Sequence, residues 1–102
     1  MSIKKQYLKN KPVCKVTFSL PKKIVKSAKT VHLVGDFNDW DQQAASMKKL
    51  KDGSFKITLE LETGREYQFR YLIDGTDWEN DWNANKYVPN PFGDSDNSVV
   101  VV

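Results

Sequence analysis

The sequence predicts an all-β domain, built as an antiparallel β-sandwich, and two observations support this fold class. Apolar and polar residues alternate with a period of two along several short segments, as they do in strands that bury one face. Residues that favour turns separate these segments at regular intervals, and about seven short strands in a chain of 102 residues are typical of a sandwich. Helical periodicity is weak and limited to residues 22–28 and 42–47.

The first strand of the alternating pattern covers residues 14–20, in which every second residue is apolar. This phase turns Cys14 toward the core, so we expect its thiol to be buried. Cys14 is the only cysteine, which excludes an internal disulfide and agrees with a reducing compartment. A second, shorter strand is predicted to begin at Val31 and to end at Gly35.

A hairpin is predicted next, with its strands at residues 47–50 and 55–61. The second of these segments has the clearest alternation in the chain. Asp52 and Gly53 lie between the two strands, and an Asp-Gly pair supplies the positive φ values that tight hairpins require.

An aromatic-rich strand follows at residues 67–73. Its inward positions are expected to be Tyr67, Phe69, Tyr71 and Ile73, and its outward positions Gln68, Arg70 and Leu72. Asp74 and Gly75 turn the chain again, and a polar segment, residues 76–97, leads to the closing valine strand. We expect this segment to be a long loop with a function, because structureless loops longer than about 12 to 15 residues are otherwise uncommon.

Positive charge is concentrated in the first part of the chain. The formal net charge is +3, but residues 1–30 hold nine lysines and no acidic residue. We expect residues 1–12 to form a basic, disordered leader and residues 13–102 to form a single domain. Such lysines can attract phosphate-rich partners, but they also solubilise a domain and protect edge strands, and we favour the second interpretation.

The sequence gives no sign of membrane insertion or secretion. No apolar run approaches the roughly 20 residues of a membrane span. The valines at residues 99–102 are too few for anything but a last strand, and no apolar segment follows the basic N-terminus as in a secretory signal. We therefore expect a cytoplasmic protein without a membrane partner.

Signals of catalytic chemistry are weak. His32 is the only histidine, which excludes a multi-histidine metal site, and no Gly-x-Ser-x-Gly motif accompanies it. Asp77, Glu79 and Asp81 alternate like calcium ligands, but the glycine and the distal glutamate of an EF-hand loop are missing. We expect these carboxylates to be solvated loop residues, and we expect no catalytic residue, metal or cofactor.

Three motifs occur in a fixed order along the chain. They are Gly-Asp-Phe-Asn-Asp-Trp at residues 35–40, Phe-Arg-Tyr-Leu-Ile-Asp-Gly at residues 69–75 and Asn-Ser-Val-Val at residues 97–100. Together they resemble the family-48 carbohydrate-binding modules, which are found in glycogen branching and debranching enzymes and in the β-subunit of AMP-activated protein kinase. The resemblance covers about residues 13–102 and implies an immunoglobulin-like sandwich of the early-set type.

The resemblance also implies binding of α-1,4-glucan, and five residues match positions that contact sugar in the family. Trp40 and Trp78 match two sugar-stacking tryptophans, and Arg70 stands where the kinase modules have a lysine that binds hydroxyls. Phe92 matches a leucine that wedges against the glucan, and Asn97 matches an asparagine that binds sugar hydroxyls. Tryptophan is commonly well buried, so core packing is the alternative for both indoles, but their polar neighbours favour the surface.

Several functions remain open at this point. The resemblance implies a stand-alone, non-catalytic module that binds glycogen or starch and targets or regulates a partner enzyme of glycogen metabolism. The alternative is a protein-interaction module of the same fold that has lost sugar binding. A nucleic-acid partner is not expected, since no oligonucleotide-binding signature accompanies the lysines. Trp82 either anchors the long loop or adds a third stacking surface.

Overall fold

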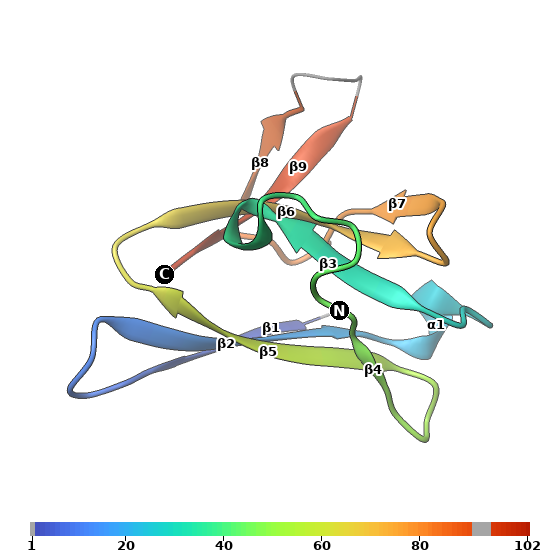
Figure 1. Ribbon diagram of the computed structural model, residues 1–102, viewed down its shortest axis with the longest axis horizontal. Coiled ribbons are helices and arrows are strands. Elements are labelled where there is room, and N and C mark those ends of the chain that lie inside the picture. Colours follow the sequence, from blue (N-terminus) through green and yellow to red (C-terminus); the bar gives the residue numbers. More distant parts are fainter. Residues whose placement is uncertain (1, 91–94) are drawn as a thin grey trace.

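The computed structural model describes residues 2–90 and 95–102, which form two antiparallel sheets packed face to face (Figure 1). The strands are β1 (Ser2–Tyr7), β2 (Val13–Leu20), β3 (Val31–Gly35), β4 (Lys48–Lys49), β5 (Phe55–Glu62), β6 (Glu66–Ile73), β7 (Asp77–Glu79), β8 (Lys86–Pro89) and β9 (Asp96–Val101). The first sheet has the order β1-β2-β5-β4, and the second has the order β3-β6-β9-β8, with β7 paired to β6. The predicted antiparallel β-sandwich, immunoglobulin-like in type, is therefore confirmed.

The core lies between the sheets and follows the alternation read from the sequence. In β2, every second residue from Cys14 to Leu20 is fully buried, as predicted. Phe69 of β6 sits at the centre of an aromatic cluster, with its ring centroid 5.2 Å from that of Phe18 and 5.7 Å from that of Tyr71. Each such edge-to-face pair adds about 0.5 to 1.5 kcal/mol to the effect of burial.

The expectation of a disordered leader is wrong for Ser2–Tyr7, which form β1 at the edge of the first sheet. The register runs from Ser2 opposite Ser19 to Tyr7 opposite Cys14. Ile3 packs against the core, and the Lys5 ammonium donates a hydrogen bond across the sandwich to the amide oxygen of Asn85, at 2.9 Å. The strand was not predicted because its lysines suggested a disordered segment. Lysines are also common on edge strands, where their charge prevents pairing with other chains.

The polar segment at residues 76–97 is not one long loop, because it contains the strands β7 and β8. Asp74 and Gly75, with φ values of 52° and 72°, make the tight turn from β6 into β7. Pro89 ends β8 on the edge of the second sheet, where a missing N–H group is tolerated. The expectation that Asp81 is a solvated carboxylate is also wrong, since its side chain is fully buried.

Helical structure is scarce. Of the two weak helical segments, one forms the short helix α1 (Lys22–Val25), whereas residues 42–47 form turns that end in an isolated bridge between Ser46 and His32. The only other helical element among the described residues is the 3-10 turn η1 (Asp36–Asn38). Within the described residues, neither helical element has the length and apolar character needed to cross a membrane.

The outer face of the second sheet carries apolar side chains that are buried. Leu72 points outward, as the alternation predicts, yet it is buried. Its cross-strand partners are His32 on one side and Trp78 on the other, and directly opposite side chains lie close together on the same face of a sheet. Val34, which lies opposite Arg70 on the same face, is fully buried as well. The neighbours of Leu72 and Val34 across the strands, Trp78 and Arg70, line a pocket on this face.

Candidate functional site

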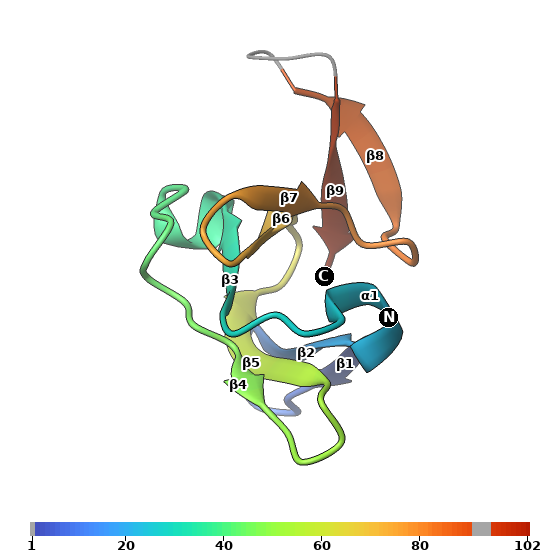
Figure 2. The same ribbon diagram turned by 90° about the vertical axis from the view of Figure 1, so that its right-hand side faces the viewer.

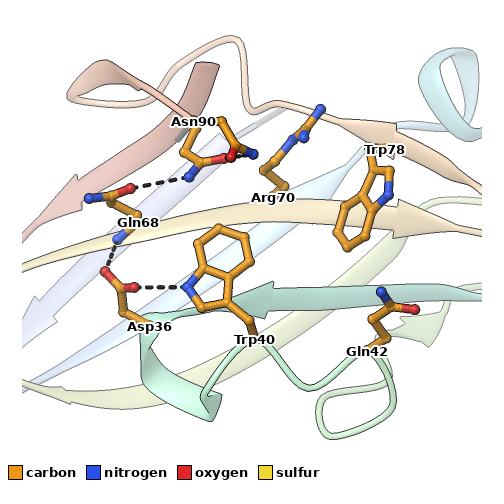
Figure 3. Close-up of a pocket in the computed structure, with 8 residues that line it drawn as sticks. Asp36, Trp40, Gln42, Gln68, Arg70, Trp78 and Asn90 are labelled. Carbon is orange, nitrogen blue, oxygen red and sulfur yellow. Dashed lines mark hydrogen bonds between the residues drawn. The ribbon is translucent and has the colours of Figure 1, made fainter. Parts of the chain in front are cut away.

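A pocket of about 580 Å³ opens on the outer face of the second sheet (Figure 3). Its lining comes from β6 and from the segments that flank β6 along its two edges. The lining residues are Asp36, Trp40, Gln42, Gln68, Arg70, Trp78, Asn90 and Asn97. β6 pairs with β3 along one edge and with β7 and β9 along the other. Residues that are distant in the sequence therefore meet around its central outward positions.

Trp40 enters the pocket from the turn that follows η1, and two hydrogen bonds fix its position. Its backbone has a left-handed conformation, with φ of 58°, and its N–H donates to the carbonyl of Gly35 at 2.9 Å. Its indole Nε1–H donates to Oδ1 of Asp36 at 2.9 Å, and the other oxygen of that carboxylate accepts the backbone N–H of Gln68 at 2.8 Å (Figure 3). Asp36 thus ties the indole to β6.

The rest of this motif explains why the turn has this shape. Asn38 folds back, accepting the N–H of Gly35 at 3.1 Å and donating to the carbonyl of Leu33 at 2.9 Å. Phe37 packs beside the aromatic core, 6.1 Å from the ring of Phe18. A side chain at Gly35 would collide with β6, because its Cβ would lie only 2.7 Å from the Cβ of Phe69. These three residues shape the turn, whereas Asp36 and Trp40 of the same motif line the pocket.

Arg70 and Trp78 form the opposite wall. The guanidinium carbon of Arg70 lies 5.4 Å from the centroid of the Trp78 ring, which is the geometry of a cation–π pair. Trp78 remains 38% exposed. The Nε atom of Arg70 is buried, and among the described residues no acceptor is within hydrogen-bond distance of it. A buried donor without a partner costs about 1 to 3 kcal/mol.

Amide side chains form one end of the pocket. Asn97 is 3% exposed, and its amide nitrogen donates to Oε1 of Gln68 at 3.1 Å. Its amide oxygen accepts a hydrogen bond from Asn90 at 3.3 Å. This chain of amides holds β9, β6 and the end of β8 in a fixed relation. The Asn97 side chain is therefore almost fully buried at this end of the pocket.

The structure places four of the five predicted site residues in this one pocket, namely Trp40, Arg70, Trp78 and Asn97. The fifth, Phe92, lies outside the described residues. The lining residues that sequence reasoning missed are Asp36, Gln42, Gln68 and Asn90. The alternation in β6 had already placed Gln68 beside Arg70 on the outer face, so that residue could have been found. Gln42 and Asn90 come from irregular segments, and no pattern in the sequence identifies them.

The pocket offers hydrogen bonds and aromatic surface rather than reactive groups. Among the described residues, its only carboxylate is Asp36, whose two oxygens each accept a hydrogen bond. Hydrolysis of a glycoside by the common mechanisms needs a pair of carboxyl groups across the sugar. In residues 2–90 and 95–102, no group of three or more His, Cys, Asp or Glu side chains could hold a metal ion. The indoles, the guanidinium and the amides of this arrangement can stack on a ligand and hydrogen-bond to it.

Comparison with known proteins agrees with this chemistry. A family model described as carbohydrate-binding module 48, the isoamylase N-terminal domain, matches residues 25–93. The chain is also 32% identical, over 62 residues, to a protein of Butyrivibrio fibrisolvens named 1,4-alpha-glucan branching enzyme GlgB. That match covers 61% of this chain but only 10% of the length of the branching enzyme. Because the family model covers more than half of the sequence, the chain belongs to the family-48 carbohydrate-binding modules.

Proposed function

We propose that the pocket binds segments of α-1,4-glucan, such as the outer chains of glycogen or starch, and that it does so without catalysis. The observation that supports this most directly is the joint presence of two indoles, a guanidinium and four amides around one open pocket. The pyranose ring has apolar C–H faces and a rim of hydroxyls. Indoles suit the faces, and amides and guanidinium groups suit the hydroxyls.

The guanidinium of Arg70 fits the same ligand. It lies beside Trp78, with its carbon 5.4 Å from the ring centroid, so a sugar that stacks on this indole brings hydroxyl oxygens close to the guanidinium. Asp36 and Arg70 both line the pocket, so their opposite charges offset each other and a neutral ligand suits this lining.

The spacing of the aromatic groups favours an oligosaccharide over a single sugar. Trp40 follows β3 and Trp78 lies on β7, and these strands flank β6 on opposite edges. Two strand spacings separate such positions by about 10 Å, which exceeds the width of one pyranose ring. With two stacking contacts and a few hydrogen bonds on an open surface, we expect a dissociation constant roughly between micromolar and millimolar.

The comparisons support a role in glucan metabolism. The similar protein is named a 1,4-alpha-glucan branching enzyme, and this chain corresponds to a small part of it. We propose that the module holds a glycogen-metabolising enzyme, as a partner, close to its polysaccharide.

Affinity electrophoresis tests the proposal directly. The protein is run through native gels that contain glycogen, soluble starch, hydroxyethylcellulose or no polysaccharide. We expect retardation by the two α-glucans and unchanged mobility in the cellulose gel, because a curved α-1,4 chain and a flat β-1,4 ribbon present their rings differently. Equal mobility in all four gels would contradict glucan binding and would leave the protein-interaction module as the better hypothesis.

A further inference from the structure

Two exposed aromatic side chains lie outside the pocket. Trp82 is 60% exposed, more than any other large apolar side chain among the described residues, and Tyr87 is 43% exposed. Neither lines the pocket. Trp82 lies in the segment between β7 and β8, and Tyr87 lies on β8.

The backbone under these two rings is firmly held. The Tyr87 hydroxyl donates to the carbonyl oxygen of Asp81, the residue that precedes Trp82. The buried Asp81 side chain accepts the hydroxyl of Tyr71 at 2.7 Å, and its backbone N–H donates to Oγ of Ser98 at 2.9 Å. The rings are therefore exposed on a rigid support, which lowers the entropy cost of binding a ligand.

Tyr87 lies on the far side of the β8–β9 hairpin from Asn97, and its hydroxyl reaches the carbonyl of the residue that precedes Trp82. Tyr87 is opposite Ser98 in the register, and Val88 is opposite Asn97, which lines the pocket. Because successive residues of a strand point to opposite faces, Tyr87 and Asn97 face away from each other. Figures 1 and 2 both show this hairpin projecting from the body of the sandwich, and Tyr87 on it is 43% exposed.

The surroundings of Trp82 favour a neutral polar ligand. The segment at residues 80–85 carries three asparagines, and its only ionisable residue, Asp81, is buried. Asn80 and Asn85 are held by hydrogen bonds to β9, so the amides belong to the rigid support. Aromatic faces among amides are the groups that recognise uncharged sugars, whereas an acidic or basic peptide would need opposite charges.

We propose that Trp82 and Tyr87 form a second glucan-binding surface, on the reverse of the hairpin that borders the pocket. This proposal rests on the function proposed above and extends it. One sugar ring cannot contact both faces of the hairpin, so the two surfaces hold different segments of polysaccharide. A module with two such surfaces gains avidity for a branched polymer that it does not show for a short oligosaccharide.

The three tryptophans provide a separate reporter for each surface. In a ¹⁵N NMR titration of the full chain with maltoheptaose, each indole N–H gives its own signal, assigned with single Trp→Phe variants. We expect the Trp40, Trp78 and Trp82 signals all to shift and saturate. In Trp40→Ala the Trp82 signal should still saturate, with its dissociation constant changed less than about twofold, because the surfaces are independent.

Each outcome separates the two proposals. If the Trp40 and Trp78 signals shift but the Trp82 signal does not, the second surface is refuted and the pocket stands. If no indole signal responds at saturating sugar, both proposals fail. A Trp82 signal that shifts in the wild-type chain but not in Trp40→Ala reports an indirect effect and also refutes a second surface.

Polysaccharide binding gives the matched functional test. In glycogen gels, Trp82→Ala and Tyr87→Ala should each weaken binding about two- to tenfold, the size of one aromatic contact. Tyr7→Ala is the control, because Tyr7 is a 57% exposed aromatic residue on β1 of the other sheet. Its substitution should leave retardation unchanged. Equal losses in Tyr7→Ala and Trp82→Ala would show a general surface effect and would overturn the proposal.

Discussion

The two faces of β6 serve different purposes, although their residues alternate along eight positions of one strand. The inward residues Tyr67, Phe69 and Tyr71 are buried in the aromatic core. The outward residues Gln68 and Arg70 line the pocket. Because one backbone carries both sets, the packing that stabilises the sandwich also fixes the positions of the binding groups. The faces should nevertheless separate in experiment, since one set contributes to stability and the other to affinity.

The largest expected effect is on the inner face. Phe69→Ala should lower the free energy of unfolding by about 3 to 5 kcal/mol, through lost burial and the cavity that remains. Chemical denaturation monitored by tryptophan fluorescence measures this. Arg70→Ala, the adjacent residue on the opposite face, is the matched comparison and should weaken sugar binding with a small change in stability. Comparable destabilisation by both substitutions would show that the faces are not separable.

A smaller effect is expected for Tyr71→Phe, which keeps the ring but removes the hydroxyl that donates to buried Asp81. Leaving that carboxylate oxygen without its donor should cost about 1 to 3 kcal/mol. If Tyr71→Phe has the same free energy of unfolding as the wild-type protein, water or another group has replaced the hydroxyl.

The same residue predicts how stability varies with pH. Burial raises the pKa of the Tyr71 hydroxyl, and the nearby Asp81 charge raises that pKa further. The stability from the neutral hydroxyl is complete below the pKa of the unfolded chain, about 10, and is lost as the pH rises above it. Urea midpoints measured between pH 7 and 11 should therefore fall less steeply for Tyr71→Phe than for the wild-type protein. Parallel curves would contradict this assignment.

On the outer face, Trp40→Ala should lower affinity for the ligand and change stability little, the opposite of Phe69→Ala. We expect glucan affinity to fall about two- to tenfold, as for one lost aromatic contact. The free energy of unfolding should change by about 1 kcal/mol or less, as is usual at surface positions. Leu50→Ala removes another exposed apolar side chain and should leave affinity unchanged. A Trp40→Ala chain that does not fold would show that the indole is a core residue.

The smallest expected effect is that of salt. Binding of a neutral glucan should change less than about twofold between low and moderate ionic strength, because no ion pair forms with the ligand. A log–log slope near one per phosphate contact would instead indicate nucleic acid bound by the lysines. Titrations with maltoheptaose and with a single-stranded oligonucleotide at several salt concentrations distinguish the two.

The sequence predicted the strands in which a local pattern of apolar and polar residues decides the structure. Alternation located β2 and β6, because a strand with one buried face must place apolar residues at every second position. It did not find β1 or β8, since these edge strands are defined by their pairing partners and carry lysines or a proline. Short edge strands have little intrinsic preference that a sequence could show.

The same limit applies to the site. Trp40 could be placed from its motif, because that motif sets the turn that leads to it. The burial of Asp81 could not be predicted, because its donors come from Tyr71 and Ser98 on two other strands. Likewise, the amide contact between Gln68 and Asn97 depends on the register of β6 with β9, which the sequence alone does not determine.

The left-handed backbone at Trp40 has a consequence for substitutions at this position. A bulky residue in that conformation loses about 1 to 2 kcal/mol relative to the right-handed region, whereas glycine adopts it freely. Substitution of glycine at this position relieves backbone strain while it deletes the stacking surface. A Trp40→Gly chain would therefore lose the indole surface and still keep most of its stability.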